Sequence, residues 1–396
     1  MITVVGGVYA ERCIEPNWVE VYGSAGRAAA ALSAVAPDVA LVTYRSSRLK
    51  AGFDNLEAVY GLQVSGPEVA FEVDFQYTHS LATPFITPRP DAIPQQEPLE
   101  AEGEVVLRFG MLEGTARITA GKAVYDPQSA FDPRPFGENG SVAKRLVLIL
   151  NRLEARCLTG EPDPERAADL LLARGEAEAV IVKMGGRGAL VAWVGGRATI
   201  PPYRSESVFK IGSGDVFSAA FTYFWAVEDR SYVEAADLAS RSTSRYCETM
   251  SRPIGSAADL AAHAFTAIMP RPGRVYLASP FFNLAERWLV EEMRDQLLGM
   301  GVEVFSPFHD VGAGSAEYVA PRDLKGLDDC DVVLAVLNGS DTGTIFEIGY
   351  AIAKGKPVVG LAQNMRAEDL KMPIGSGCVI ATDLVTAIYH TIWALA

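Results

Sequence analysis

The sequence predicts an α/β protein built from two domains. Short apolar runs alternate with longer stretches of helical periodicity, which is typical of parallel sheets covered by helices. The chain has 396 residues, more than the roughly 100–200 residues of a typical single domain. Six runs are predicted to be buried strands: Ile2–Val5, Val39–Val42, Ala179–Lys183, Val275–Ala278, Val332–Val336 and Val358–Leu361.

Composition narrows the class of protein. An apolar fraction of 49% is ordinary for a globular chain, and the net charge of −14 argues against nucleic acid or an anionic membrane as a partner. Phosphorylated small molecules stay possible, because local groups hold them. Five scattered cysteines without a CxxC pair, an N-terminus without a basic leader and the lack of any apolar run of membrane-spanning length predict a cytoplasmic location.

One stretch is predicted to form a lid outside the parallel sheets. From Glu68 to Tyr77 apolar and polar residues alternate, which predicts a strand with one wet face. Prolines follow at 84, 88, 90, 94 and 98, and a second strand-like run, EVVLRFGM, ends at Met111. Residues 64–110 are therefore predicted to be an antiparallel flap with a proline-stiffened crossing. A surface excursion without a functional role is the alternative.

The domain boundary is predicted at MPRPG, Met269–Gly273. Two prolines and a glycine follow a helical stretch there, and a new strand begins at Val275. The predicted domains are residues 1–268 and 273–396, both of ordinary size.

A glycine-rich turn in the first domain suggests a phosphate site. In FKIGSGDVFSAAF, the residues Gly212, Ser213 and Gly214 precede Asp215 and an apolar helical pattern. Small residues at a helix start leave backbone N–H groups free to face an anion, and the helix dipole favours negative charge there. A carboxylate at the same turn can deprotonate a hydroxyl that attacks a bound phosphate. The alternative is a glycine-rich turn with Asp215 as a helix cap.

Three more segments accompany this turn in a fixed order. They are VYDPQ (Val124–Gln128), LNRLEARCLTG (Leu150–Gly160) and VIVKMGGRGALV (Val180–Val191). Together, over about residues 1–255, the four segments resemble the ribokinase-like (PfkB) family of sugar and nucleoside kinases. The resemblance implies a three-layer α/β fold with a β-strand lid, and ATP and Mg²⁺ as cofactors.

By that resemblance, Asp215 is the catalytic base, and Gly212, Ser213 and Gly214 form the anion hole for the transferred phosphoryl group. Asn151 and Glu154, one helical turn apart, organise the magnesium ion through water; a solvated helix face is the alternative for this pair. The residues that approach ATP are Lys183, Gly185 and Gly188.

The acceptor end departs from the family pattern. Glu11 stands where the family usually has Asp, and Tyr22-Gly23 followed by Arg27 stands where it has Gly-Gly and a later Asn. Arginine presents a planar fork that suits a carboxylate or phosphate. Either the acceptor carries an additional anionic group, or Arg27 pairs with Glu11 and the sugar pocket is altered. A domain that binds phosphate without catalysis is a further alternative.

In the second domain, two carboxylates flank a strand-to-helix turn. Asp341 follows the strand Val332–Val336, and Glu347 is predicted in the first turn of a helix from about Thr344 to Lys354. Both residues thus follow the carboxyl end of a strand, and open α/β sheets bind ligands at the carboxyl ends of their strands. Thr344 and Glu347 also have the spacing of a capping box, so Glu347 as a helix cap is the alternative.

Four segments place this turn in a wider pattern: YLASPFF (Tyr276–Phe282), FSPFHDVG (Phe305–Gly312), RDLKGLDDCDVVLAVL (Arg322–Leu337) and DTGTIFEIGYA (Asp341–Ala351). They resemble the nucleoside 2-deoxyribosyltransferase family over almost all of residues 273–390. The resemblance implies a smaller flavodoxin-like, doubly wound parallel sheet without a cofactor, and a homo-oligomer, a dimer or larger.

By the same resemblance, Glu347 is the nucleophile that holds the sugar as a covalent ester. Asp341 binds the nucleobase edge and helps to move its proton, Asp323 lies near the base, and Tyr276 contacts the nucleophile and sugar. Either a second base or water would release the sugar, so both transfer and hydrolysis stay open.

Three hypotheses for the whole chain follow. The first is a bifunctional enzyme: the C-terminal domain cleaves or exchanges the base of a (deoxy)nucleoside or nucleotide, and the N-terminal domain transfers the γ-phosphate of ATP to a hydroxyl of a sugar or nucleoside. The second is a single active glycosyl-transferring domain with a degenerate kinase domain that binds a nucleotide and regulates it. The third is a binding module in which Glu347 is only a cap.

Overall fold

The computed structural model describes residues 1–129 and 132–396. The chain divides into two compact units: unit 1 comprises residues 1–205 and 209–267, and unit 2 comprises residues 206–208 and 268–396. No helix in the described part of the chain is both long and apolar enough to cross a bilayer.

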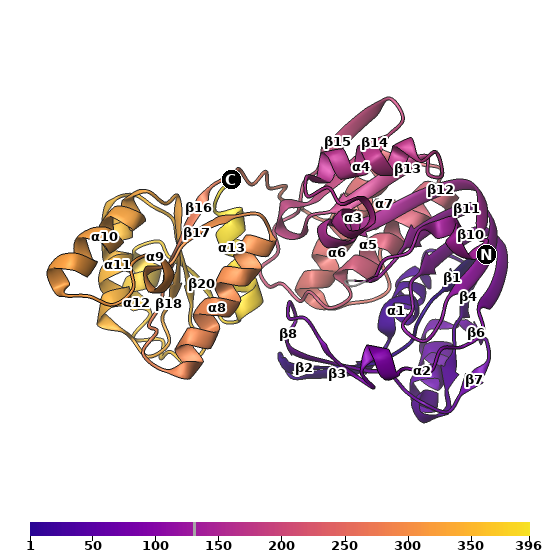
Figure 1. The fold of residues 1–396 in the computed structure, drawn as a ribbon, viewed down its shortest axis with the longest axis horizontal. Coiled ribbons are helices and arrows are strands. Elements are labelled where there is room, and N and C mark those ends of the chain that lie inside the picture. The colour runs from indigo at the N-terminus through magenta and orange to yellow at the C-terminus, as the bar shows by residue number, and fades with distance from the viewer. Residues whose placement is uncertain (130–131) are drawn as a thin grey trace. The chain divides into compact units, whose positions relative to one another are not determined.

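Unit 1 is built on a nine-stranded sheet (Figure 1). In spatial order its strands are β15 (Gly196–Ile200), β14 (Ala189–Trp193), β13 (Ala179–Lys183), β12 (Val142–Asn151), β11 (Ala116–Asp126), β10 (Leu99–Phe109), β1 (Ile2–Val5), β4 (Val39–Val42) and β6 (Gln63–Ser65). Only β14 runs antiparallel to its neighbours within this described sheet. Because the other strands are parallel, their carboxyl ends meet at one edge, where the glycine-rich turn lies.

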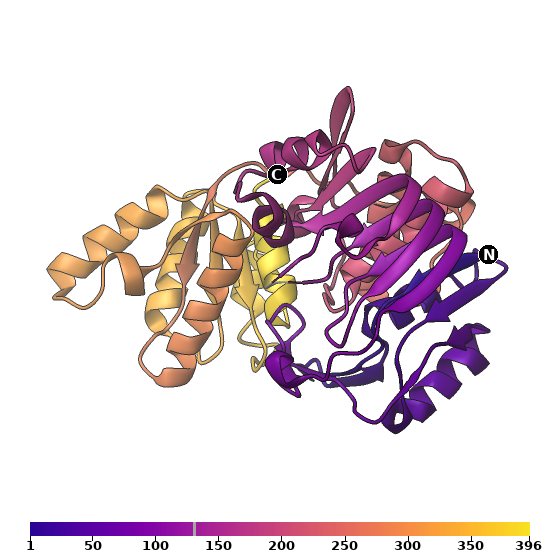
Figure 2. The same ribbon diagram turned by 45° about the vertical axis from the view of Figure 1, so that its right-hand side comes forward.

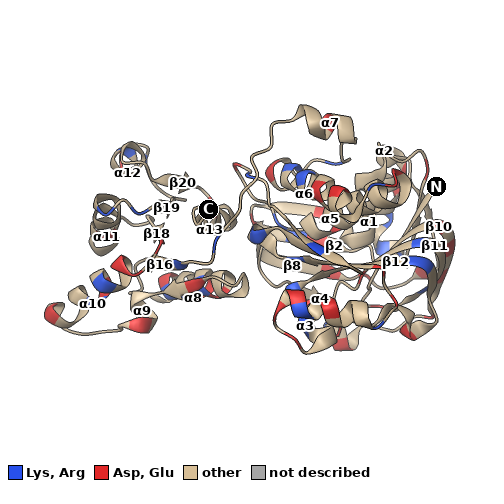
Figure 3. Ribbon diagram, turned by 90° about the horizontal axis from the view of Figure 1, so that it is seen from above, with Lys and Arg blue, Asp and Glu red and all other residues tan. Residues whose placement is uncertain are grey.

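Helices cover both faces of this sheet (Figure 3). The helices of unit 1 are α1 (Gly23–Leu32), α2 (Lys50–Tyr60), α3 (Arg152–Thr159), α4 (Pro164–Ala173), α5 (Ser213–Thr222), α6 (Tyr232–Thr249) and α7 (Ala257–Ala262). Helices α1, α5 and α6 lie on one face, and α3 and α4 lie on the other (Figure 3). The unit thus has the three-layer α/β architecture that the sequence predicts.

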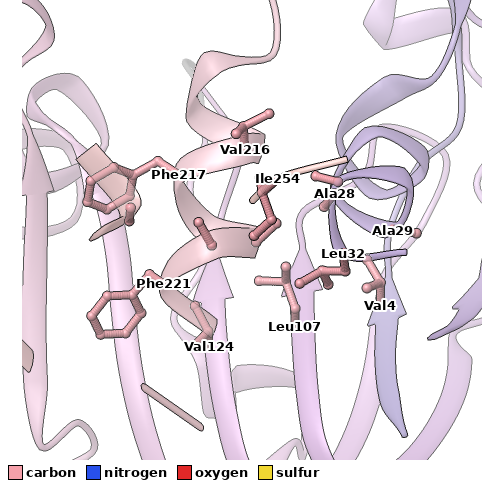
Figure 4. Close-up of a cluster of buried hydrophobic side chains, with 14 of the residues drawn as sticks. Val4, Ala28, Ala29, Leu32, Leu107, Val124, Val216, Phe217, Phe221 and Ile254 are labelled. Carbon is pink, nitrogen blue, oxygen red and sulfur yellow. The ribbon is translucent and has the colours of Figure 1, made fainter. Parts of the chain in front are cut away.

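A hydrophobic core lies between the sheet and the helices α1 and α5, and it holds α5 in place (Figure 4). Val216, Phe217 and Phe221 of α5 are buried with Leu32 of α1 and Leu107 of β10. Alanines at 28–31 of α1 have no exposed surface, which lets the two helices pack closely. This packing holds the N-terminus of α5, with Asp215, at the sheet edge.

A separate four-stranded sheet corresponds to the predicted lid only in part. Its order is β3 (Trp18–Val21), β2 (Ala10–Glu15), β8 (Asp74–His79) and β9 (Phe85–Thr87), with a two-stranded pair, β5 (Arg45–Ser46) and β7 (Glu68–Val69), elsewhere. The predicted continuous strand over Glu68–Tyr77 is therefore interrupted after Val69 and resumes at Asp74.

The prediction that EVVLRFGM belongs to the lid is wrong. Residues 104–109 of this run are the second half of β10, which pairs in parallel with β1 and β11 in the main sheet (Figure 2). The five consecutive residues Val105–Phe109 are all buried. Such a continuous buried run is typical of a central parallel strand covered on both faces, whereas a lid strand has one wet face.

Unit 2 is a five-stranded parallel sheet. Its order is β17 (Glu303–Phe305), β16 (Arg274–Ala278), β18 (Val332–Val336), β19 (Val358–Leu361) and β20 (Val379–Ala381). Counted from the first strand of the unit, this is the 2-1-3-4-5 order of the flavodoxin-like fold, as predicted. Its helices are α8 (Leu284–Gly299), α9 (Pro307–Asp310), α10 (Ala316–Asp328), α11 (Thr342–Ala353), α12 (Lys371–Gly375) and α13 (Leu384–Trp393).

Helices of unit 2 pack in two pairs, α8 with α13 and α10 with α11. All five residues of the central strand β18 are buried, as expected for a strand covered on both faces. In this fold, ligands bind outside the carboxyl ends of the strands at the switch point between the first and third strands. Here that point lies between β16 and β18, where Tyr276 and the loop before α11 are found.

Candidate active sites

In unit 1, the glycine-rich turn opens α5 as predicted. Gly212 precedes the helix with a φ of +77°, and Ser213 is its first residue. The Lys210 ammonium donates to the Ser213 hydroxyl at 2.5 Å. A Cβ atom added to Gly214 would lie 3.3 Å from Lys183 Nζ. Two lysines and the N-terminus of a ten-residue helix therefore converge where the sequence predicts an anion.

Lys183 is held by a buried aspartate that sequence analysis left without a role. Lys183 Nζ donates to Asp126 Oδ2 at 2.5 Å, and the Ser218 hydroxyl donates to the same oxygen at 2.8 Å. Asp126 Oδ1 has no hydrogen-bond partner among the described residues. Asp126 ends β11, and Lys183 ends β13, which lies two strands away in the sheet with β12 between them. The segment VYDPQ contained the signal, an aspartate directly after an apolar run.

Asp215 is buried in an ion-pair cluster. Arg27 donates to Asp215 Oδ2 at 2.9 Å and to Glu11 Oε2 at 2.5 Å, and Gln128 donates to Asp215 Oδ1 at 3.2 Å. The exposed fractions are 1% for Arg27 and 5% for each acid. Burial raises the pKa of Asp215 to about 6, opposed by Arg27 and assisted by Glu11. Of the two alternatives for Arg27, the structure has the pairing with Glu11, and it adds Asp215 as a second partner.

Asn151 and Glu154 form a capping box at the start of α3. Asn151 Oδ1 accepts from Glu154 N at 2.9 Å, and Glu154 Oε2 accepts from Asn151 N at 2.7 Å. Glu154 Oε1 accepts from Ser129 N at 3.2 Å. Glu154 is 2% exposed, so the alternative of a solvated helix face is wrong for it.

Asn151 and Glu154 fit direct coordination of a magnesium ion poorly, and their predicted action through water stays a prediction. Both oxygens of Glu154 are bonded to backbone N–H groups, and burial raises its pKa to about 8, assisted by Asp126. Among residues 1–129 and 132–396, no cluster of three or more His, Cys, Asp or Glu side chains has the arrangement of a metal site.

Gly185 and Gly188 shape the turn after β13. Their φ angles are +59° and +82°, and Met184 N donates to Gly188 O at 2.7 Å. A Cβ atom on Gly188 would lie 2.0 Å from the Ile200 carbonyl oxygen. The two glycines therefore allow a tight turn beside the end of β13, where Lys183 lies.

In unit 2, Glu347 is held by a tyrosine from the central sheet. The Tyr276 hydroxyl on β16 donates to Glu347 Oε1 on α11 at 2.6 Å. Burial raises the pKa of Glu347 to about 7; the tyrosine opposes this shift, and Asp323 and Asp341 assist it. The Tyr276 ring stacks on Phe305, with centroids 5.4 Å apart, which fixes the hydroxyl.

The prediction about the start of this helix is corrected. Helix α11 begins at Thr342, so Glu347 lies in its second turn. The helix cap is Asp341, whose Oδ2 accepts from Thr344 N at 2.8 Å and from the Thr344 hydroxyl at 3.0 Å. The alternative that Glu347 is the cap is therefore wrong, because its carboxylate is directed to Tyr276.

Asp323, on α10, is the third acid of this site. Burial raises its pKa to about 6, and its Oδ1 has no hydrogen-bond partner among the described residues. Its charge acts on both Glu347 and Tyr276. Thus α10, α11 and β16 bring three of the predicted site residues together, with Asp341 at the start of α11.

A segment of each unit matches the model of a known protein family. Residues 140–251 match the model of the pfkB family carbohydrate kinases. Residues 275–379 match the model of nucleoside 2-deoxyribosyltransferase. The chain joins a PfkB segment to a nucleoside 2-deoxyribosyltransferase segment. The PfkB segment contains α3, α4 and α5, and the deoxyribosyltransferase segment contains Tyr276, Asp323, Asp341 and Glu347.

Two curated relatives match shorter stretches. A putative 2′-deoxynucleoside 5′-phosphate N-hydrolase of Thermofilum pendens is 38% identical over 56 residues, which are 14% of this chain and 39% of the relative. An uncharacterized protein of Ureaplasma parvum is 27% identical over 104 residues, 23% of this chain and 66% of the relative. The chain thus spans less than two thirds of the length of either one.

The fold of unit 1 also occurs in a solved ribokinase. The structure of Arabidopsis thaliana ribokinase complexed with ribose and ATP superposes with a TM-score of 0.51. That match covers 66% of this chain and 97% of the ribokinase at 16% sequence identity. At this identity, the likeness establishes the ribokinase-like fold of the PfkB-type unit.

Proposed function

We propose that the chain is an enzyme of nucleoside or sugar metabolism, and that unit 2 cleaves the N-glycosidic bond of a (deoxy)nucleoside or nucleotide. The observation that carries this proposal is the 2.6 Å hydrogen bond from Tyr276 to Glu347. It holds a carboxylate at the ligand-binding edge of the sheet and leaves Glu347 Oε2 for a substrate. The match of residues 275–379 to the nucleoside 2-deoxyribosyltransferase model supports the same chemistry.

In the proposed mechanism, Glu347 Oε2 attacks the anomeric carbon. The C–N bond breaks, its electron pair leaves with the base, and a proton from an acid neutralises the base. Positive charge that builds on the sugar ring is stabilised by the carboxylate, as in retaining glycosidases. Water or a second base then attacks the glycosyl ester and frees Glu347, which gives hydrolysis or transfer.

Asp323 is the better candidate for the proton donor. A group with a pKa of about 6 carries a proton in part of the molecules near neutral pH, which suits a general acid. Asp341 Oδ2 accepts the hydrogen bond that caps α11. We therefore assign only Asp341 Oδ1 to the edge of the base.

Trapping tests the role of Glu347. The full chain is incubated with a 2′-deoxy-2′-fluoro nucleoside, digested and sequenced by mass spectrometry. We expect the added mass on the peptide that contains Glu347, and none in Glu347→Gln. A label on another residue, or turnover by Glu347→Gln at the wild-type rate, would refute the mechanism. A panel of nucleosides and 5′-monophosphates then identifies the substrate.

For unit 1, we propose that the turn Gly212–Gly214 with Lys183 binds the phosphates of ATP. Gly185 and Gly188 would lie beside the nucleotide, and Asp215 would take the proton of an acceptor hydroxyl. A second candidate is a unit that binds the nucleotide without transfer and regulates unit 2. The ion pair between Arg27 and Asp215 favours this second candidate. The homo-oligomer and the cytoplasmic location stay predictions.

A further inference from the structure

We propose that Arg27 is a built-in block of phosphoryl transfer in unit 1, because its guanidinium occupies the place at Asp215 that an acceptor hydroxyl needs. The inference rests on the proposed role of Asp215 as the base. In the transfer step, the acceptor oxygen bonds to the γ-phosphorus of ATP, the bond to ADP breaks, and the hydroxyl proton moves to the Asp215 carboxylate. That proton transfer needs a carboxylate oxygen within hydrogen-bond reach of the hydroxyl.

Both oxygens of Asp215 are engaged within the protein. Oδ2 accepts from Arg27 at 2.9 Å, and Oδ1 accepts from Gln128 at 3.2 Å. Gln128 is in turn fixed by the Ser24 hydroxyl, which donates to its Oε1 at 3.1 Å. Gln128 has a φ of +48°, an uncommon backbone conformation for a residue other than glycine. Each oxygen therefore already has one ordered donor, and because Asp215 is only 5% exposed, an acceptor hydroxyl has little room to reach a remaining lone pair.

The arginine itself is tightly enclosed. Besides Asp215 it bonds to Glu11, and Glu11 Oε2 also accepts from Gly23 N at 3.2 Å. The rings of Trp18 and Tyr22 lie 5.9 and 5.5 Å from its guanidinium carbon. A Cβ atom on Gly212 would lie 2.1 Å from Arg27 Cδ, so the phosphate-binding turn itself packs against this side chain. Removing Arg27 from Asp215 thus requires the pocket to repack.

The cluster is unsuited to an anionic acceptor. Arg27 carries one positive charge, and Glu11 and Asp215 together carry two negative charges when ionised. A carboxylate or phosphate that approached Arg27 would meet both acids at short range, and like charges in a buried site repel strongly. The structure therefore favours Arg27 as a block over Arg27 as a reader of an anionic acceptor.

Three proteins test the proposal in the full chain: the wild type, Arg27→Asn with Glu11→Gln, and the same pair with Asp215→Asn. Glu11 is replaced together with Arg27 because the pair of changes preserves the formal charge of the cluster and so protects folding. Thermal melting and calorimetric binding of ATP confirm that each protein is intact. The matched control is Arg252→Asn, because Arg252 also stacks on Tyr22, at 4.1 Å, and lies outside the bonds to Asp215 described above.

Phosphoryl transfer is measured with labelled ATP and Mg²⁺ on ribose, 2-deoxyribose, myo-inositol, adenosine, 2′-deoxyadenosine and ribose 5-phosphate. We expect wild type and Arg252→Asn at the background of the triple variant, and the double variant at least about tenfold above it on one neutral acceptor. The proposal is overturned if the wild type transfers phosphate in a way that depends on Asp215 and the double variant does not exceed it. This holds whether the acceptor is neutral or is ribose 5-phosphate. So does a folded, ATP-binding double variant that stays at background. Nucleoside cleavage by unit 2, assayed in parallel, reports separately on the proposed glycosidic activity.

Discussion

Replacing Tyr276 by phenylalanine should change the pH dependence of nucleoside cleavage. The tyrosine hydroxyl donates to Glu347 at 2.6 Å and lowers the pKa of a carboxyl that burial raises to about 7. A hydrogen bond to a charged group is worth about 1.5–3 kcal/mol, and about 1.4 kcal/mol corresponds to one pKa unit. The pKa of Glu347 in Tyr276→Phe should therefore rise by about one to two units, to roughly 8–9.

The sign of the effect follows from the need for an ionised nucleophile. At pH 7 about half of the wild-type Glu347 is ionised when its pKa is about 7. A rise of about one to two units leaves roughly 1–10% ionised, which lowers kcat/KM at pH 7 by about 5- to 50-fold. As the pH rises toward 9.5, kcat/KM of Tyr276→Phe should approach that of the wild type at the same pH, while both values fall because Asp323, the proposed proton donor, loses its proton.

The assay is the profile of kcat/KM between pH 5 and 9.5 for a cleaved nucleoside. Tyr350→Phe is the matched control, since Tyr350 lies on the same helix and donates to Asp328 at 3.1 Å instead. Its profile should coincide with that of the wild type. An unchanged apparent pKa in Tyr276→Phe, with activity lost evenly at all pH values, would refute the electrostatic role of the tyrosine.

Three further predictions concern stability. The pKa of Glu347 in the folded protein is raised from 4.5 to about 7. Its protonated form therefore stabilises the protein below pH 4.5, and this stability is lost as the pH rises through 7. Glu347→Gln should accordingly raise the free energy of unfolding by about 2–3 kcal/mol at pH 8 and change it little at pH 4.5. Asp341→Ala should lower stability by about 0.5–2 kcal/mol through loss of the helix cap, and Asp341→Asn should not. Gly188→Ala should cost roughly 2 kcal/mol more than Gly175→Ala, because both glycines have positive φ but only the first meets a carbonyl oxygen at 2.0 Å. Denaturant titration measures all three, and equal costs at the two glycines would contradict the last.

The fold was predictable because buried parallel strands appear in the sequence as short runs of apolar residues. Five of the six predicted strands have the observed bounds, and the sixth, β16, begins one residue earlier, at Arg274. The strand β10 was missed for a related reason. Its first half alternates and its second half is continuously buried, so the run that follows the prolines at 84–98 resembled the return strand of a flap. Pairing with β1 and β11, which lie far away in sequence, decides its place.

Candidate residues of both sites could be predicted from the sequence, but their hydrogen-bond and ion-pair partners could not. The spacing of Thr344 and Glu347 fits a capping box, yet Asp341 takes the Thr344 N–H and frees Glu347 for Tyr276, which is 71 residues away. The bond between Arg27 and Asp215 spans 188 residues. Contacts of this separation depend on which strands end at the same sheet edge, and that is a property of the assembled topology.

The same physical device has different consequences in the two units. Burial raises the pKa of Asp215 to about 6 and that of Glu347 to about 7, so in each unit an acid sits at the edge of a parallel sheet in a poorly solvated place. Glu347 accepts a hydrogen bond from a neutral donor at Oε1, which leaves Oε2 for the proposed substrate. Asp215 meets a buried cation on one oxygen and an amide on the other. A substrate can approach Glu347 Oε2 without breaking the bond from Tyr276, whereas breaking the buried ion pair of Arg27 and Asp215 costs about 3–5 kcal/mol. On this reasoning the glycosidic chemistry proposed for unit 2 needs only a substrate, whereas the phosphoryl transfer proposed for unit 1 needs Arg27 to leave Asp215 first.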